Sequence, residues 1–229
     1  MIANLFRGPD RVARRALELY SGAGRRDRLH VRLRWATCPI AVVDAEVPTR
    51  GRVLEIGCGH GLVSAYLALA CPEREVRGVD IDERKLTIAR AAAARLDAGD
   101  GSLELALSDG GFVPAGPWDA IVIVDVLYLL DADHELALLD ACVAELAPAG
   151  SLVIKETDVV PRLKHTIARL QEVFATRVLR ITAGESLAFT PIGELAEHLD
   201  DQGLSVTVRR VDGGYPHPHS LLVARRRPS

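Results

Sequence analysis

The sequence predicts an α/β protein: a three-layer, doubly wound sheet that is mostly parallel, is closed by a C-terminal antiparallel β-hairpin and carries an N-terminal helical arm. Three observations predict this fold. Short apolar runs alternate with helical segments of about ten or more residues, which is typical of right-handed βαβ units with parallel strands. A glycine-rich turn follows the first apolar run. The turn-rich sequence GGYPHP joins the last two apolar runs, and strands joined by so short a link pair antiparallel.

The first 48 residues are expected to form the helical arm or lid, and residues 49–229 the main domain. Apolar residues fall near helical spacing before SGAG at 21–24, a typical helix stop. A second helix is predicted over about 28–46. The arm is basic, since residues 1–34 hold nine arginines and three acids in a chain of net charge −3. Such an arm favours contact with an anionic substrate, a carrier protein or the periphery of a membrane, or it is simply a solvated helix face.

The main domain is predicted from its alternating segments. Its most apolar run, DAIVIVDV at 119–126, suits a strand that is buried on both faces. A late helix is expected to have Thr190 as its N-cap and Pro191 at its first position. The predicted strands are 53–56, 75–80, 103–107, 119–126, 151–155, 205–211 and 220–225, and the predicted helices are 61–70, 83–96, 131–147, 161–175 and the one that follows Thr190.

Composition narrows the class of protein. No apolar run reaches the roughly 18 residues that a membrane span needs, so stable membrane insertion is not expected. The N-terminus has no apolar core followed by a cleavage site, and we expect a cytoplasmic protein. The four cysteines show neither CxxC spacing nor a disulfide framework, and no metal site is expected. A net charge of −3 argues against a DNA-binding protein. Monomer and homodimer both remain open.

The strongest local signal is VLEIGCGHG at 53–61. Its glycines, Gly57, Gly59 and Gly61, stand where a buried strand turns into a helix, which is where open α/β sheets bind nucleotides. A dinucleotide fingerprint would need glycine or alanine where Leu62 stands, and a P-loop would need lysine followed by serine or threonine. Glu55 suits a ligand that bears an ammonium group better than one that bears phosphates. The pattern therefore favours a nucleoside with an amino-acid tail over NAD or ATP.

Two further carboxylates follow the next two strands. Asp80 ends the second strand in VRGVDID, where a carboxylate can accept both hydroxyls of a ribose. Asp109 follows the third strand in SDGG, where it and the N–H of Gly110 can read the amino edge of adenine. Either acid alone is also a common helix cap. Together with Glu55, they fit one adenosine with a positively charged tail.

From about Arg52 to Asp158 the sequence resembles the class I, Rossmann-like S-adenosylmethionine-dependent methyltransferases of the small-molecule type. The resemblance is carried by VLEIGCGHG, GVDID, SDGG, WDAIVIVDVLYLL and LAPAGSLVIKE. It implies S-adenosylmethionine as cofactor, S-adenosylhomocysteine as product, and a methyltransferase domain over 49–229. By position it implies that Glu55 and the glycine loop meet the methionine end of the cofactor. It likewise places Asp80 at the ribose, Ile81 and Asp109 at the adenine, and Asp125 opposite the methyl group.

The segment before the first strand often covers the cofactor in this fold, so we expect Arg32 or Arg34 to pair with the methionine carboxylate and Trp35 to close the lid; the alternative is a helix packed on the sheet edge. The expected cofactor-binding residues are Glu55, Gly57, Cys58, Gly59, Gly61, Asp80, Ile81, Asp109, Gly110, Asp125, Val126 and Arg34.

The acceptor is marked more weakly. Methyltransferases that act on exocyclic amino groups usually carry Asn or Asp, then Pro-Pro and an aromatic residue, after the fourth strand; here that place begins Asp125-Val126. Asp125 is expected to orient or deprotonate the acceptor, or to hold the sulfonium region. His217 and His219 flank Pro218, and we expect His217 to act as base if the turn folds toward the pocket. Three residues at the end of the fifth strand, Lys155, Glu156 and Asp158, are expected to border the acceptor pocket.

The expected function is methyl transfer to an O or N atom of a small or lipid-like metabolite, with anionic and carrier-bound acceptors included. The alternatives are methylation of a protein or RNA side group, and a non-catalytic module that binds S-adenosylmethionine.

Overall fold

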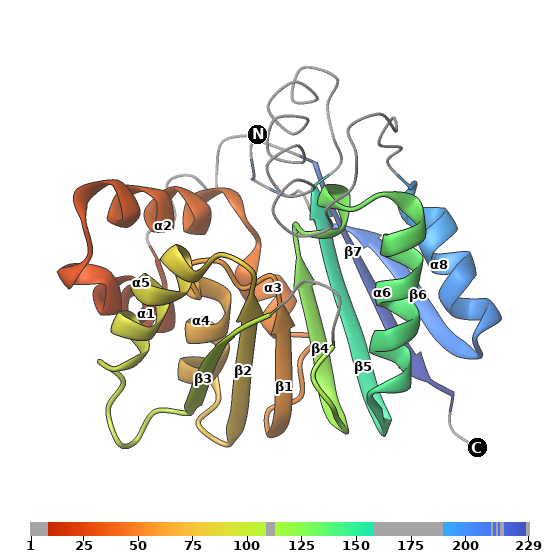
Figure 1. Cartoon of the computed structure of the whole chain (residues 1–229), viewed down its shortest axis with the longest axis horizontal. Coiled ribbons are helices and arrows are strands. Elements are labelled where there is room, and N and C mark those ends of the chain that lie inside the picture. The colour runs from red at the N-terminus through yellow and green to blue at the C-terminus, as the bar shows by residue number, and fades with distance from the viewer. Residues whose placement is uncertain are drawn as a thin grey trace.

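The computed structural model describes residues 9–108, 113–157, 190–211, 213, 215 and 218–227. Seven strands form one sheet in the order β3-β2-β1-β4-β5-β7-β6 (Figure 1). Neighbouring strands pair parallel except β7, which runs antiparallel to both β5 and β6. The predicted doubly wound sheet with an antiparallel C-terminal hairpin is confirmed. The strands are β1 (Gly51–Ile56), β2 (Arg74–Asp80), β3 (Ser102–Leu107), β4 (Trp118–Val124), β5 (Leu146–Thr157), β6 (Leu204–Arg210) and β7 (His219–Arg226).

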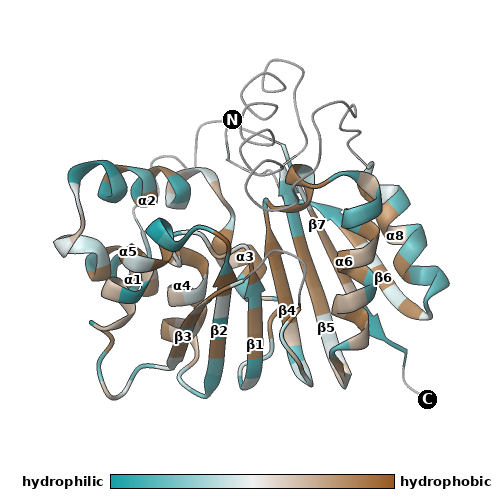
Figure 2. Cartoon of the chain, in the orientation of Figure 1, coloured by the Kyte–Doolittle hydropathy of each residue, from teal (hydrophilic) through white to brown (hydrophobic). Residues whose placement is uncertain are grey.

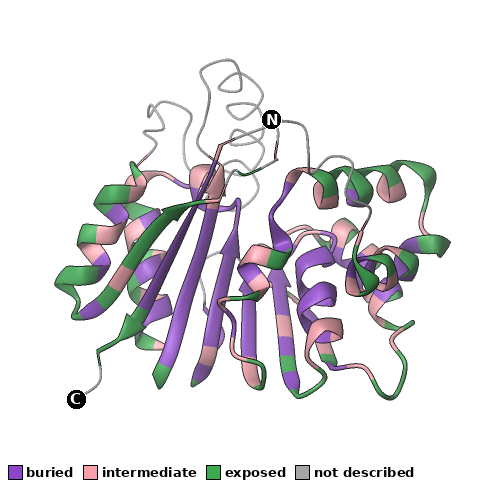
Figure 3. Cartoon of the chain, turned by 180° about the vertical axis from the view of Figure 1, so that it is seen from behind, coloured by how far each residue is buried: buried purple, intermediate pink, exposed green. Residues whose placement is uncertain are grey.

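The middle stretches of the central strands are apolar because helices cover both faces of the sheet. In β4, Ile121, Val122 and Ile123 are fully buried. Val122 belongs to the core on one face, whereas Ile121 and Ile123 belong to the core on the other. The central strands are mainly hydrophobic (Figure 2) and mainly buried (Figure 3). The sequence order of the strands reverses between β1 and β4, so a ligand crevice is expected at the carboxyl ends of these two strands.

The helices form the outer layers. One face is covered by α1 (Arg11–Glu18), α3 (Ile40–Asp44), α4 (Leu62–Ala70) and α5 (Glu83–Ala93), and the other by α6 (Ala132–Ala144) and α8 (Ile192–Asp201). The helix α2 (Arg25–Thr37) lies beside α1 and α5 toward the carboxyl ends of the strands (Figure 1). Three helices begin at an aspartate whose carboxylate accepts backbone N–H groups of the first turn, which is the usual N-cap: Asp10, Asp82 and Asp131.

The arm packs into the same core as the sheet. Ala13, Ala16 and Tyr20 are buried in the cluster that also contains strand residues of β1 and β4. Arg74, at the start of β2, is 2% exposed and donates to the carboxylate of Asp44 at 2.5 Å and to the carbonyl of Pro48 at 2.6 Å. A buried guanidinium needs such partners, and these two bonds fix the end of the arm to the sheet.

Several element boundaries differ from the prediction. The helix predicted over 131–147 ends at Ala144, because β5 begins at Leu146 instead of at 151. The single helix predicted over 28–46 is divided into α2 and α3 by Cys38, which is extended at φ −119° and ψ 130°. Pro39 is the reason, because a proline disfavours the helical conformation of the residue before it. Pro191 is the N-cap of α8 rather than its first residue, so the expected cap Thr190 stands one residue too early. The helix predicted over 161–175 lies outside the described residues.

Among the helices that the structure describes, none has both the length and the apolar composition that crossing a membrane would require.

Candidate cofactor and acceptor site

The glycine loop leaves β1 through three glycines with positive φ. Gly57, Gly59 and Gly61 have φ values of 74°, 55° and 73°, which is the left-handed region that favours glycine. A Cβ atom on Gly57 would lie 2.4 Å from a methyl group of Val126, so packing against the loop after β4 also demands glycine there. A Cβ atom on Gly59 would meet nothing closer than 3.9 Å. The loop is therefore open at Gly59, where a ligand can approach the backbone.

The loop is tied to the end of β2. The N–H groups of Gly57 and Cys58 both donate to the carbonyl of Val79, at 2.8 and 3.0 Å. The backbone N–H of Gly59 donates to Oδ2 of Asp80 at 2.7 Å, and the backbone N–H of Asp82 donates to Oδ1 of the same carboxylate at 2.8 Å. Asp80 is 8% exposed and is held in one orientation. Each carboxylate oxygen has a second acceptor direction, so Asp80 can still receive ribose hydroxyls.

Glu55 lies beneath the loop and is 2% exposed. Its carboxylate accepts a hydrogen bond from the hydroxyl of Ser64 in α4. Burial raises the pKa of Glu55 to about 7, against the lowering effect of Ser64. A buried carboxyl group that is half ionised near neutral pH is suited to a cationic ligand group, which would favour its charged form.

Asp125 is the centre of a buried charge cluster at the carboxyl end of β4. Its backbone has φ 56°, a left-handed value at a non-glycine residue. Its carboxylate accepts from Arg34 of α2 at 2.6 Å and from the Thr157 hydroxyl at 2.8 Å. The Lys155 ammonium donates to both of its oxygens, to Oδ1 at 2.7 Å and to Oδ2 at 2.8 Å. Burial alone would raise the pKa of Asp125, but Arg34 and Lys155 outweigh it and hold the pKa at about 2. Asp125 is therefore ionised across the physiological range.

His219 of β7 joins this cluster through Thr157, its partner across the strand pair. Its Nδ1 lies 3.2 Å from the Thr157 hydroxyl oxygen, which also accepts from Lys155 at 2.9 Å. Because the Asp125 carboxylate can only accept, the hydroxyl proton of Thr157 is directed to it. His219 must then donate from Nδ1, which assigns its tautomer.

Glu156 points to the loop that follows Asp125. Its Oε1 accepts from the backbone N–H groups of Val126 and Leu127 at 3.1 and 2.9 Å. These bonds fix the start of the short 3₁₀-helix η2 (Leu127–Leu129). Burial, and next the negative charge of Asp125, raise the pKa of Glu156 to about 8. The pKa values of these two carboxyl groups, at the ends of neighbouring strands, are therefore shifted in opposite directions.

The arm contacts the glycine loop from outside. The Tyr20 hydroxyl donates to the carbonyl of His60 at 2.6 Å. The His60 ring lies 4.6 Å from that of His30, and its Nε2 is 3.4 Å from the carboxylate of Asp27. The arm thus lies over the loop and, through Arg34, over the end of β4.

The structure brings together most of the site residues that the sequence predicts. Glu55, Cys58, Asp80 and Val126 meet at the carboxyl ends of β1, β2 and β4, and Ile81 directly follows β2. The predicted residues Asp109, Gly110, Asp158 and His217 lie outside the described residues.

Sequence reasoning missed Thr157, because a single hydroxyl at a strand end carries no pattern. The partner of Arg34, which here is Asp125, was also not foreseen.

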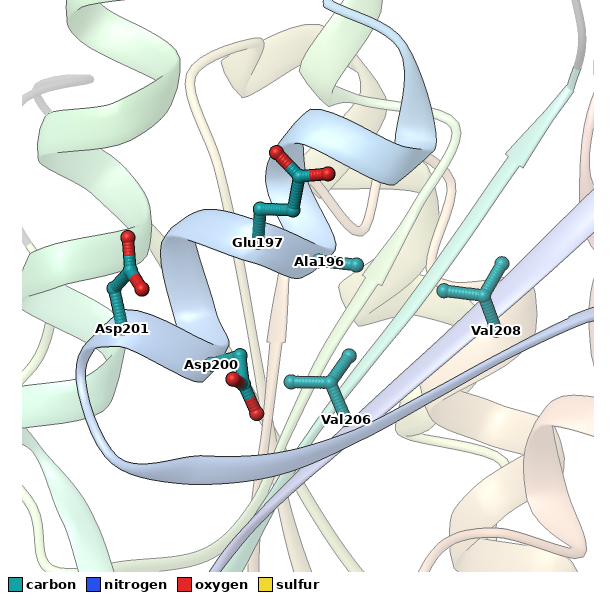
Figure 4. Close-up of a pocket in the computed structure, with 6 residues that line it drawn as sticks. All are labelled: Ala196, Glu197, Asp200, Asp201, Val206 and Val208. Atoms are coloured by element: carbon teal, nitrogen blue, oxygen red, sulfur yellow. The ribbon is translucent and has the colours of Figure 1, made fainter.

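Two other features lie apart from this site. A shallow groove between α8 and β6 is lined by Ala196, Glu197, Asp200, Asp201, Val206 and Val208 (Figure 4). It adjoins the edge strand farthest from β3 and contains none of the predicted site residues. Within the described ranges, no three His, Cys, Asp or Glu side chains gather as a metal-binding group.

Comparisons with known proteins agree on the kind of domain. Residues 53–150 match the family model of the methyltransferase domain. The chain is 25% identical over 169 residues to the ubiquinone biosynthesis O-methyltransferase of Marinobacter nauticus, a match that covers 72% of this chain and 68% of that protein. It is 32% identical over 136 residues to the trans-aconitate 2-methyltransferase of Methylobacterium radiotolerans, which covers 58% and 49% of the two chains.

The aligned stretches span between 26% and 68% of the length of four curated relatives. Among solved structures, the magnesium protoporphyrin IX methyltransferase of Synechocystis with bound S-adenosylhomocysteine superposes with a TM-score of 0.62 at 19% identity, covering 93% of this chain and 94% of that one. At this identity the likeness shows the fold.

Proposed function

We propose that this chain, whose residues 53–150 match the methyltransferase domain, is a class I S-adenosylmethionine-dependent methyltransferase and transfers the methyl group of that cofactor to an O or N atom of a small or lipid-like metabolite. One observation carries the proposal. The loop open at Gly59, the oriented Asp80 and the ionised Asp125 converge at the carboxyl ends of β2, β1 and β4, at the switch point of the sheet.

The residues have complementary roles in this proposal. Glu55 receives the ammonium group of the methionine end, and Asp80 receives the ribose hydroxyls. Ile81 packs against the adenine, with Asp109 and Gly110 at its edge. The arm over residues 1–48 serves as a lid.

Arg34 exchanges part of its contact with Asp125 for the methionine carboxylate. Its side chain is 30% exposed and therefore accessible to an arriving anion.

S-adenosylmethionine supplies, when bound, a methyl group already activated by its sulfonium. The protein's task is then to align the acceptor and exclude water, and alignment alone is worth about 7–11 kcal/mol in well-oriented reactions. Asp125 holds a fixed negative charge at the methyl side of the site, where it stabilises positive charge and positions the acceptor. Arg34 and Lys155 hold that carboxylate in place.

The charges at the acceptor side favour an anionic acceptor. Arg34 and Lys155 are two cations that share one firmly ionised carboxylate, Asp125. With the methionine carboxylate on Arg34 and the ammonium group on Glu55, the sulfonium leaves one positive charge, which a carboxylate or phosphate on the acceptor would compensate. The relative named trans-aconitate 2-methyltransferase acts on such a molecule by its name, which supports the same class.

The experiment that tests this function is calorimetric titration of the full chain with S-adenosylhomocysteine, with NADH as the control ligand. We expect binding of the first and none of the second. Asp80→Ala should lose most of the affinity, whereas Asp82→Ala should keep it, because Asp82 caps α5 instead of facing the ribose. Binding of NADH, or unchanged affinity of Asp80→Ala, would overturn the assignment. A screen of small carboxylic acids against their neutral amides, read as release of S-adenosylhomocysteine, then tests the acceptor class.

A further inference from the structure

Two carboxyl groups, those of Asp125 and Glu156, lie at the carboxyl ends of β4 and β5, and the contacts of Asp125 make it a poor proton acceptor. Its two oxygens already accept four hydrogen bonds, from Arg34, Lys155 and Thr157. A carboxylate held by two cations binds a proton only at low pH. Methyl transfer to a hydroxyl or a protonated amine nevertheless requires that a proton leave the acceptor.

Glu156 differs from Asp125 in its contacts. Its Oε1 is fixed by the N–H groups of Val126 and Leu127, so the carboxyl group has a defined orientation. Its Oε2 is buried and has no hydrogen-bond partner within the described part of the chain. If Glu156 served only to cap η2, nothing would require the second oxygen to be withdrawn from water. A buried oxygen without a partner is costly in a native structure, and such atoms often mark a functional site.

The surroundings of Glu156 tune it for proton transfer. The charged and titratable groups that act on it among the described residues are Asp125 of the β4 end, Lys155 of β5 and Tyr128 of η2. Burial and the Asp125 charge raise its pKa to about 8, while Lys155 and the two backbone N–H groups lower it. A general base works best when its pKa lies near the working pH.

We propose that Glu156 is the general base of this site and takes the acceptor's proton on Oε2, while Asp125 is a positioning residue. This inference rests on the proposed function. In the step, the acceptor O–H or N–H bond breaks and its proton passes to the Glu156 carboxylate. The acceptor atom forms a bond to the methyl carbon, and the electron pair of the C–S bond returns to sulfur. The products are the methylated acceptor, S-adenosylhomocysteine and a protonated Glu156.

An acceptor-free experiment tests the placement of Glu156. Infrared titration of the full chain should show a protonated carboxyl band that disappears near pH 8 and is absent in Glu156→Gln. Gln keeps an oxygen for the two backbone N–H groups. If Glu156 faces the methyl group, the sulfonium of S-adenosylmethionine should lower its midpoint relative to S-adenosylhomocysteine by about half a pH unit or more. The matched control is Glu135→Gln, since Glu135 is a buried carboxyl group with a raised pKa on α6, outside the site.

The outcomes separate the two proposals. If S-adenosylhomocysteine binds but the Glu156 band has the same midpoint with either ligand, the base assignment is wrong and the cofactor assignment stands. With an acceptor from the screen, Glu156→Gln should lower kcat by about 10²–10⁴-fold and remove the acidic limb of its pH profile, with unchanged affinity for S-adenosylhomocysteine. Glu135→Gln should keep the limb. A Glu156→Gln enzyme with the wild-type profile would overturn the proposal.

Discussion

Lys155→Met removes one cation from the buried cluster and leaves the carboxylate behind. Lys155 is 1% exposed and donates to both oxygens of Asp125 and to the Thr157 hydroxyl. Methionine fills a similar volume with an unbranched apolar chain, so the substitution tests charge more than packing. Asp125 keeps Arg34 and Thr157 as partners, and these limit the damage.

The expected loss follows from two estimates. Breaking a buried ion pair by removing one partner costs about 3–5 kcal/mol. Independently, the fall of the Asp125 pKa from 3.8 to about 2 corresponds to about 2–3 kcal/mol of folding stability from all its partners together. We therefore expect Lys155→Met to lower the free energy of unfolding by about 2–4 kcal/mol. For a chain of this size that is roughly 5–12 °C in Tm.

The pH dependence has a definite sign. Since the folded-state pKa of Asp125 is depressed, its stabilisation is present above pH 3.8 and is lost as the pH falls toward 2. In Lys155→Met the pKa of Asp125 should rise, because only Arg34 and Thr157 then remain to oppose the raising effect of burial. The acid-induced loss of stability should therefore begin at a higher pH.

The assay is urea unfolding at pH 7, followed by circular dichroism and by the fluorescence of the buried Trp118. A double-mutant cycle with Asp125→Asn should give a coupling energy of about 1–3 kcal/mol. Lys85→Met is the matched control, since the Lys85 side chain is 37% exposed and its ammonium lies 3.7 Å from the carboxylate of Asp82; it should cost less than about 1 kcal/mol. An equal decrease in the free energy of unfolding for the two lysine variants would refute the reasoning. So would additive decreases for Lys155→Met and Asp125→Asn in the cycle.

Two further predictions concern the cofactor side. Gly57→Ala places its Cβ 2.4 Å from Val126 at φ 74° and should destabilise the chain by about 2–4 kcal/mol in the same unfolding assay. Gly59→Ala has room for its Cβ at φ 55°, so it should lower the free energy of unfolding by only about 1–2 kcal/mol. It should nevertheless weaken S-adenosylhomocysteine binding tenfold or more. A larger loss of stability in Gly59→Ala than in Gly57→Ala would contradict the open backbone at Gly59. Binding of S-adenosylhomocysteine should release protons at pH 7, because its ammonium favours ionised Glu55, whose pKa is about 7 when unliganded. Calorimetry in two buffers of different ionisation enthalpy measures this release, and the same release in Glu55→Gln would contradict it.

Much of the fold was predictable because its signals are local. Burial on both faces makes β4 apolar from Ala120 to Val124, and the turn from strand to helix requires glycine, so both features can be recognised from consecutive residues. The division of the predicted helix at Cys38 was also local, since Pro39 forbids continuation, but the prediction gave that signal too little weight.

The acceptor side was less predictable because its partners are distant in sequence. Asp125 was expected near the methyl group on position alone, yet its protonation state depends on Arg34, 91 residues earlier, and on Lys155, 30 residues later. The same holds for Glu156, whose pKa depends on burial and on the charge of Asp125.

The sequence by itself determined the strand-to-helix turn, the acids at the strand ends and the order of the parallel units, because backbone sterics and hydropathy act between near neighbours. Only the tertiary structure decided which carboxyl group is ionised. Charge and desolvation act through space, and the cluster forms only when α2, β4, β5 and β7 meet at one edge of the sheet.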